Sequence, residues 1–83
     1  MKVTIKYFAS IREAIGQGSE VRDTDAATLA ALRDELLAAS PAHAQTLARG
    51  KSVRMALNQA MRDESAALTD GCEVAFFPPV TGG

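Results

Sequence analysis

Hydrophobic and polar residues alternate near the start of the chain, which predicts a first β-strand over residues 3–8. Its two faces carry Val3, Ile5 and Tyr7 on one side and Thr4, Lys6 and Phe8 on the other. The first set is the more apolar and is expected to face the core. Phe8 is therefore an aromatic residue on a polar face, directed away from the core.

Two helices follow from spacing and from capping residues. Ser10 is placed to cap a short helix that Gly16 ends. Thr28 begins the main helix, and Ser40-Pro41 stops it. On that helix Leu29, Leu32, Leu36 and Ala39 form the apolar stripe, while Arg33, Asp34 and Glu35 turn mostly outward. Residues 42–49 indicate one further helical stretch.

The remaining strands are shorter. They are expected over residues 20–23, 53–57, 60–62 and 73–77, with turns at Asn58-Gln59 and Asp70-Gly71. Pro78 and Pro79 end the last strand because neither can donate a ladder hydrogen bond. The pattern therefore predicts an α+β domain over residues 1–79, a mixed sheet with one main helix packed on one face, and an extended tail over residues 80–83.

Length and charge narrow the classes of function. Eighty-three residues, 47% hydrophobic and 23% charged, are enough for one small globular domain. Nine basic against ten acidic residues, with no basic block, argue against nucleic-acid binding. No apolar run is long enough for a membrane helix, and no signal peptide is apparent, so we expect a cytoplasmic protein and no membrane partner.

Few residues suggest catalysis. Cys72 is the single cysteine and His43 the single histidine, which excludes an internal disulfide and predicts no metal site. Cys72 lies between Gly71 and Glu73, a setting that does not activate a thiol. We expect Cys72 to be structural or incidental and His43 to be a solvated side chain. The sequence also contains no phosphate loop or nucleophile motif.

The C-terminus is the most informative segment. After the two prolines come Val80, Thr81, Gly82 and Gly83, too short and too poor in apolar groups to pack as an element. Prolines stiffen the exit from the fold, and glycines without Cβ atoms can enter a narrow channel in another protein. A terminal carboxylate, ionised above a pKa of about 3.5, must be activated before it can acylate a nucleophile. The tail is therefore expected to be a substrate, with Gly83 as its reactive end.

Three segments resemble one known family. The family is that of molybdopterin synthase small subunits, whose ending resembles residues 68–83, LTDGCEVAFFPPVTGG. The first strand and helix of that family resemble residues 7–16, YFASIREAIG. Its middle strand resembles residues 56–59, ALNQ. The resemblance spans the chain, and the FFPPVTGG ending is its specific part. Cys72 departs from the family, where an acidic or other polar residue is usual.

That resemblance implies a ubiquitin-like β-grasp fold and a sulfur-carrier cycle. An ATP-dependent enzyme would adenylate Gly83, and a sulfur donor protein would convert it to a thiocarboxylate. The tail, Val80 to Gly83, would then enter the large synthase subunit, within a heterotetramer, and give sulfur to cyclic pyranopterin monophosphate. The family implies no cofactor bound by the small subunit itself, with ATP used by the activating enzyme. Catalytic side chains would belong mainly to the partner.

Two alternatives share the Gly-Gly ending. One is the sulfur carrier for thiamine thiazole synthesis, and the other is a ubiquitin-like modifier whose terminal glycine forms isopeptide bonds with lysines. The FFPPV ending favours the molybdopterin carrier.

Strand parity adds a candidate partner surface. If Val74 and Phe76 face the helix, Phe77 points outward beside Phe8, because the first and last strands are neighbours in a β-grasp fold. We expect the two rings, extended by Met61 and continued by Pro78 and Pro79, to form the interface with the large subunit.

Overall fold

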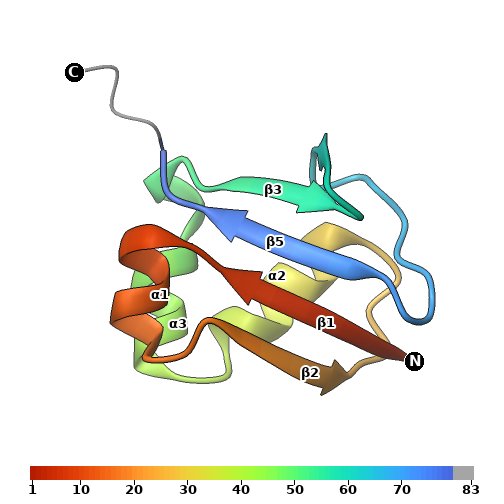
Figure 1. The fold of residues 1–83 in the computed structure, drawn as a ribbon, viewed down its shortest axis with the longest axis horizontal. Helices are drawn as coiled ribbons and strands as arrows, with labels where there is room; N and C mark the ends of the chain where they lie inside the picture. The colour runs from red at the N-terminus through yellow and green to blue at the C-terminus, as the bar shows by residue number, and fades with distance from the viewer. Residues whose placement is uncertain (80–83) are drawn as a thin grey trace.

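Five strands form one mixed sheet in the order β2-β1-β5-β3-β4, and three α-helices cover one of its faces (Figure 1). The computed structural model describes residues 1–79. The strands are β1 (Lys2–Tyr7), β2 (Ser19–Asp23), β3 (Arg54–Leu57), β4 (Ala60–Arg62) and β5 (Glu73–Phe77). The central pair, β1 and β5, is parallel, and the other three pairs are antiparallel. This is the predicted α+β class.

The helices are α1 (Ala9–Ile15), α2 (Leu29–Leu37) and α3 (Pro41–Leu47), followed by the short 3-10 turn η1 (Arg49–Lys51). In Figure 1, α2 passes behind the sheet, and α1 and α3 lie together at the end where β1 stops. The opposite face of the sheet carries no helix among residues 1–79, and we call it the open face. No helix in this range has the length and apolar character needed to cross a membrane.

The core lies between the sheet and the helices, and its main residues follow the predicted periodicities. Buried positions on the strands are Val3, Ile5, Tyr7, Met55, Val74 and Phe76, and those on the helices are Ile11, Leu29, Leu32, Leu36 and Leu47. The alternation in the first strand and the leucine stripe of the main helix are thus confirmed. Because each strand alternates its side chains, the polar set of the first strand faces away from the helices.

Three local predictions about the helices are wrong. Ala39 is exposed, because α2 ends at Leu37 and the chain turns there. Arg33 is buried and only 4% exposed, instead of turning outward. Ser10 lies inside α1 and does not cap it, since Phe8 is the N-cap residue and makes no side-chain cap bond.

Pro41 acts differently from expected. It does follow the end of the main helix, but it also begins α3, where a proline loses no helical hydrogen bond. The Ser40 hydroxyl caps that helix by accepting from the His43 N–H at 3.2 Å. The helical stretch expected over residues 42–49 is therefore present, but it begins at Pro41 and ends at Leu47.

The turns agree with the sequence. Gly16 ends α1 with a φ of 90°, a left-handed conformation that favours glycine. Asn58 and Gln59 connect β3 to β4 with φ values of 50° and 71°, as a tight hairpin of the primed type requires. Gly71 has a φ of 81°, and the neighbouring Asp70 carboxylate accepts a hydrogen bond from the Lys2 N–H at 2.8 Å.

Candidate functional site

The chain leaves the domain at the end of β5. This strand lies at the centre of the sheet, between β1 and β3, and it ends at Phe77 as the two prolines predict. Pro78 is half-buried and Pro79 is exposed. The predicted reactive segment, with Val80, Thr81, Gly82 and Gly83, lies outside the residues that the structure describes. The surroundings of Pro78 and Pro79 therefore define the base of the tail.

Two aromatic rings stack beside this base. Phe8 and Phe77 have ring centroids 4.7 Å apart and planes inclined by 12°. Phe8 follows β1 directly, and its N–H donates to the carbonyl oxygen of Phe76 at 3.3 Å, which holds the two chain segments together. Phe8 is 40% exposed. The expected pair of outward-facing rings is thus present, and it adjoins Pro78.

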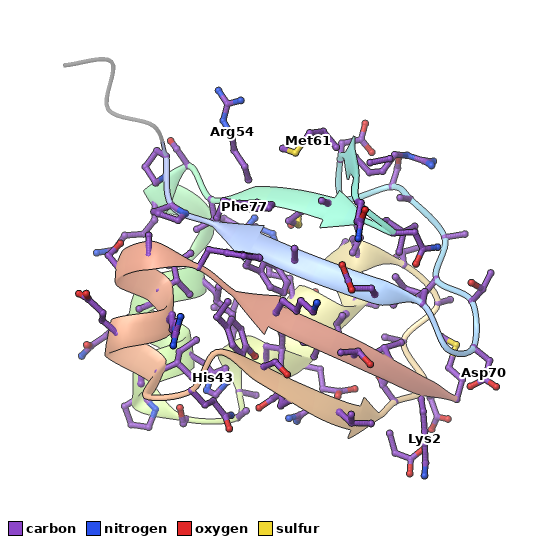
Figure 2. All side chains as sticks on the ribbon, in the orientation of Figure 1. Lys2, His43, Arg54, Met61, Asp70 and Phe77 are labelled. Atoms are coloured by element: carbon purple, nitrogen blue, oxygen red, sulfur yellow. The ribbon has the colours of Figure 1, made fainter. Side chains whose placement is uncertain are left out.

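Met61 extends the same face. Its pairing partner across β4 and β3 is Ala56, and Ala56 in turn pairs with Ala75, two residues before Phe77. Residues paired across a sheet share a face, so Met61 and Phe77 are both on the open face. Figure 2 shows both labelled side chains on the β3 side of the sheet, with Arg54. Met61 is 57% exposed, and we call Phe8, Phe77 and Met61 the open-face patch.

The charges around the open-face patch are partly paired. The Lys6 ammonium lies 3.2 Å from a Glu73 carboxylate oxygen, so this pair contributes little net charge. Arg54 pairs with Phe77 in the sheet register, is exposed, and has no ion-pair partner within residues 1–79. The patch is therefore apolar with the positive charge of Arg54 at its border, a composition typical of a protein-binding surface.

Cys72 lies at the opposite end of β5 from the tail base, so it is not part of this site. It precedes Glu73, whereas the tail follows Phe77, and five strand residues span roughly 16 Å at about 3.3 Å each. The thiol is free and only 3% exposed, packed in the hydrophobic core. Its burial agrees with the structural role expected for it.

His43 is buried, which corrects the expectation of a solvated side chain. It is 8% exposed, and its ring meets that of Tyr7 edge-on at a centroid distance of 5.7 Å. Nδ1 lies 2.7 Å from the Ser40 hydroxyl, and Nε2 has no partner within residues 1–79. The alanines beside it in the sequence gave no sign of this burial, which depends on β1 and α3 packing together.

Tyr7, the most strongly perturbed titratable group within residues 1–79, is also structural. Burial raises the pKa of Tyr7, and the neighbouring Glu20 carboxylate raises it further. The hydroxyl therefore stays protonated and donates to Glu20 at 3.3 Å. It serves as a buried donor on the helix-covered side of β1.

The fold and the tail base together define a ubiquitin-like β-grasp domain whose last strand lies at the centre of the sheet and ends beside a partly exposed aromatic pair. The model of the ThiS family matches residues 5–83. The chain belongs to that family.

Known relatives and solved structures support this family assignment. The molybdopterin synthase sulfur carrier subunit of Escherichia coli (strain K12) is 42% identical over 81 residues, covering 98% of this chain and 99% of that protein. SAMP1 of Haloferax volcanii, a small archaeal modifier protein, superposes with a TM-score of 0.83 at 28% identity, with all of both chains covered. A chain from the complex of subunits 1 and 2 of the Helicobacter pylori 26695 molybdopterin-converting factor superposes with a TM-score of 0.72 at 26% sequence identity, again with both chains fully covered.

Proposed function

We propose that this protein is the sulfur-carrier small subunit of molybdopterin synthase and that its sulfur is held as a thiocarboxylate on Gly83. The observation that carries the proposal is the full-length similarity to a molybdopterin synthase sulfur carrier subunit, together with the Gly82-Gly83 ending. The partly exposed aromatic pair at the tail base supports it, because a partner that takes up the tail must bind the carrier near the point where the tail leaves the domain.

The chemistry follows from the terminal carboxylate. A carboxylate oxygen of Gly83 attacks the α-phosphorus of ATP, giving an acyl-adenylate and releasing pyrophosphate. A persulfide on a donor protein then displaces AMP and forms an acyl disulfide. A thiol attacks the donor's sulfur in that S–S bond, which releases the terminal thiocarboxylate and leaves a disulfide on the donor. The sulfur finally passes to cyclic pyranopterin monophosphate, with water supplying the oxygen that restores the carboxylate.

The chain needs partners for each of these steps. The large synthase subunit would receive the tail within a heterotetramer, and an adenylating enzyme and a sulfur donor protein would load it. The first partner is supported by the Helicobacter pylori structure, which is a complex of subunits 1 and 2. The open-face patch, with Pro78 and Pro79, would form the contact surface. We place these steps in the cytoplasm, where the folded domain would meet all three proteins.

Protein modification is the second candidate, and the similarity to a small archaeal modifier protein favours it. A modifier would use the same adenylate but would end in an isopeptide bond between Gly83 and a lysine. A role in thiamine thiazole synthesis would use the same thiocarboxylate with another partner. The molybdopterin carrier is preferred because its relatives are the more similar in sequence.

Reconstitution with the adenylating enzyme, ATP, a sulfur donor and the large subunit tests the proposal. Intact mass should show one oxygen of the carrier replaced by sulfur, and the loaded carrier should convert cyclic pyranopterin monophosphate to molybdopterin. Deleting Gly83 should abolish both signals while leaving the thermal transition nearly unchanged. A ladder of conjugates with no thiocarboxylate would establish the modifier instead, and full activity of the deletion would refute the role of Gly83.

A further inference from the structure

A groove borders the tail base on the side away from the open-face patch. Its volume is about 330 Å3, and it lies between α1, α3, η1 and the two prolines. The lining residues are Ser10, Ile11, Ala14, Gln45, Thr46, Lys51, Val53, Pro78 and Pro79. Ile11 is buried and Val53 is half-buried against the core, so the floor is apolar and fixed by the fold.

Three polar groups at this groove are available to a ligand. The Ser10 hydroxyl, the Gln45 amide and the Lys51 ammonium have no hydrogen-bond or ion-pair partner within residues 1–79. Thr46 differs, because its hydroxyl donates to the Ala42 carbonyl at 2.7 Å. Ser10 is free because Phe8, and not Ser10, occupies the N-cap of α1. The groove therefore combines an apolar floor with donors at its rim.

The charge of the groove selects the kind of segment it would bind. Lys51 is its single charged lining residue and is exposed. An exposed ammonium beside an apolar floor attracts a carboxylate, and the removal of water on docking strengthens that attraction. The complementary partner segment would carry one acidic side chain next to an aliphatic one.

A partner that binds the tail must come close to the groove. Pro79 lines the groove, and four residues follow it in the sequence. Four residues reach at most about 14 Å even when fully extended. A protein that encloses Gly83 must therefore approach the domain closely around Pro79, where the groove opens.

We propose that this groove is a second docking site for the large synthase subunit, occupied by a segment that places a carboxylate on Lys51 and an aliphatic side chain over Ile11 and Val53. The proposal rests on the function proposed above. It adds a contact on the helix side of the tail, so that the partner holds the tail base from two sides.

Binding of the unloaded, full-length protein to the large subunit, measured by calorimetry, tests this site. Lys51→Glu should weaken binding about tenfold, whereas Lys51→Arg should bind like the natural protein. Ala14→Trp, at an exposed helical position, should weaken binding by filling the groove. Lys2→Glu makes the same charge change at the far end of the sheet, where Figure 2 labels Lys2, and should have little effect.

Each variant is also loaded with sulfur by the adenylating enzyme, and its thermal transition is recorded. Unchanged loading with weakened binding supports the proposal. Normal binding by both Lys51→Glu and Ala14→Trp would overturn it, and so would a defect confined to loading, which would assign the groove to the adenylating enzyme. If the natural protein itself fails to bind the large subunit, the function proposed above fails, which is a separate result.

Discussion

Ala9 occupies a conformation that alanine seldom adopts. Its φ is 50°, and it joins Phe8 to the first turn of α1. A side chain in the left-handed region costs roughly 1–2 kcal/mol, which the surrounding packing must offset. The benefit is the orientation of the preceding residue, since Phe8 continues the direction of β1 and its ring reaches Phe77.

Replacing Ala9 by glycine should stabilise the fold by about 0.5 kcal/mol, because the relief of strain exceeds the entropy that glycine adds to the unfolded chain. Urea denaturation measures the effect. Ala31→Gly, at an exposed position within α2, is the matched control and should destabilise by about 1 kcal/mol. An equal decrease in the free energy of unfolding of both variants would show that Ala9 is unstrained.

Cys72 is the residue most easily mistaken for the sulfur carrier. Cys72→Ala should retain thiocarboxylate formation, because the thiol is buried at the end of β5 opposite to the tail. The smaller side chain should lower stability by about 1 kcal/mol through the lost packing. Intact mass after loading provides the measurement, and a folded variant that gains no sulfur would contradict the prediction.

At the level of elements, Arg33 connects α2 with the end of α3. Its Nε donates to the Leu47 carbonyl at 2.7 Å, and Nη2 donates to the Ala48 carbonyl at 3.0 Å. Nη1 lies 3.5 Å from a Glu64 carboxylate oxygen. Carbonyls at a helix end have no partner within the helix, so the guanidinium satisfies groups that would otherwise be unpaired.

Arg33→Met should destabilise the domain by about 3 kcal/mol, since it leaves buried carbonyls unsatisfied although it keeps much of the side-chain volume. Arg49→Met is the control. Arg49 also pairs with Asp34 and Glu64, but it is exposed, so its replacement should destabilise the domain much less than that of Arg33. Thermal denaturation compares the two, and similar losses would show that burial of Arg33 is unimportant.

For the whole molecule, the central prediction concerns the open-face patch. Phe8→Ala and Phe77→Ala should each weaken large-subunit binding by about 2 kcal/mol, the usual effect of removing an aromatic anchor from an interface. Domain stability should fall far less, most clearly for the exposed Phe8. Calorimetry gives the affinity, and the thermal transition gives the stability.

Val21→Ala is the matched control for these rings. Val21 pairs with Thr4, so it lies on the same open face, and it is 69% exposed. It belongs to β2, two strands away from β5 on the β1 side. Its replacement should leave binding unchanged. A loss of fold with unchanged affinity in the phenylalanine variants would instead make those rings core residues.

The sequence predicted most of the local structure because the relevant signals are local. Alternation around Ile5, the leucine spacing of α2, the glycine at residue 16 and the paired prolines each act within a few residues, and each was confirmed. Strand parity also placed Phe8 and Phe77 correctly, because a two-residue period leaves only two faces to choose between. The role of Gly83 stays a prediction.

Only the tertiary structure determines the burial and contacts of residues whose neighbours come from distant segments of the chain. Arg33 is buried because its carbonyl and carboxylate partners lie 14 to 31 residues away, and helical periodicity contains no information about them. His43 is buried because α3 packs over Tyr7. Ser10 borders a groove only because α1 begins two residues earlier than its capping signal indicated. Sequence patterns record which residues prefer water, whereas burial of a polar residue depends on whether folding supplies it with partners.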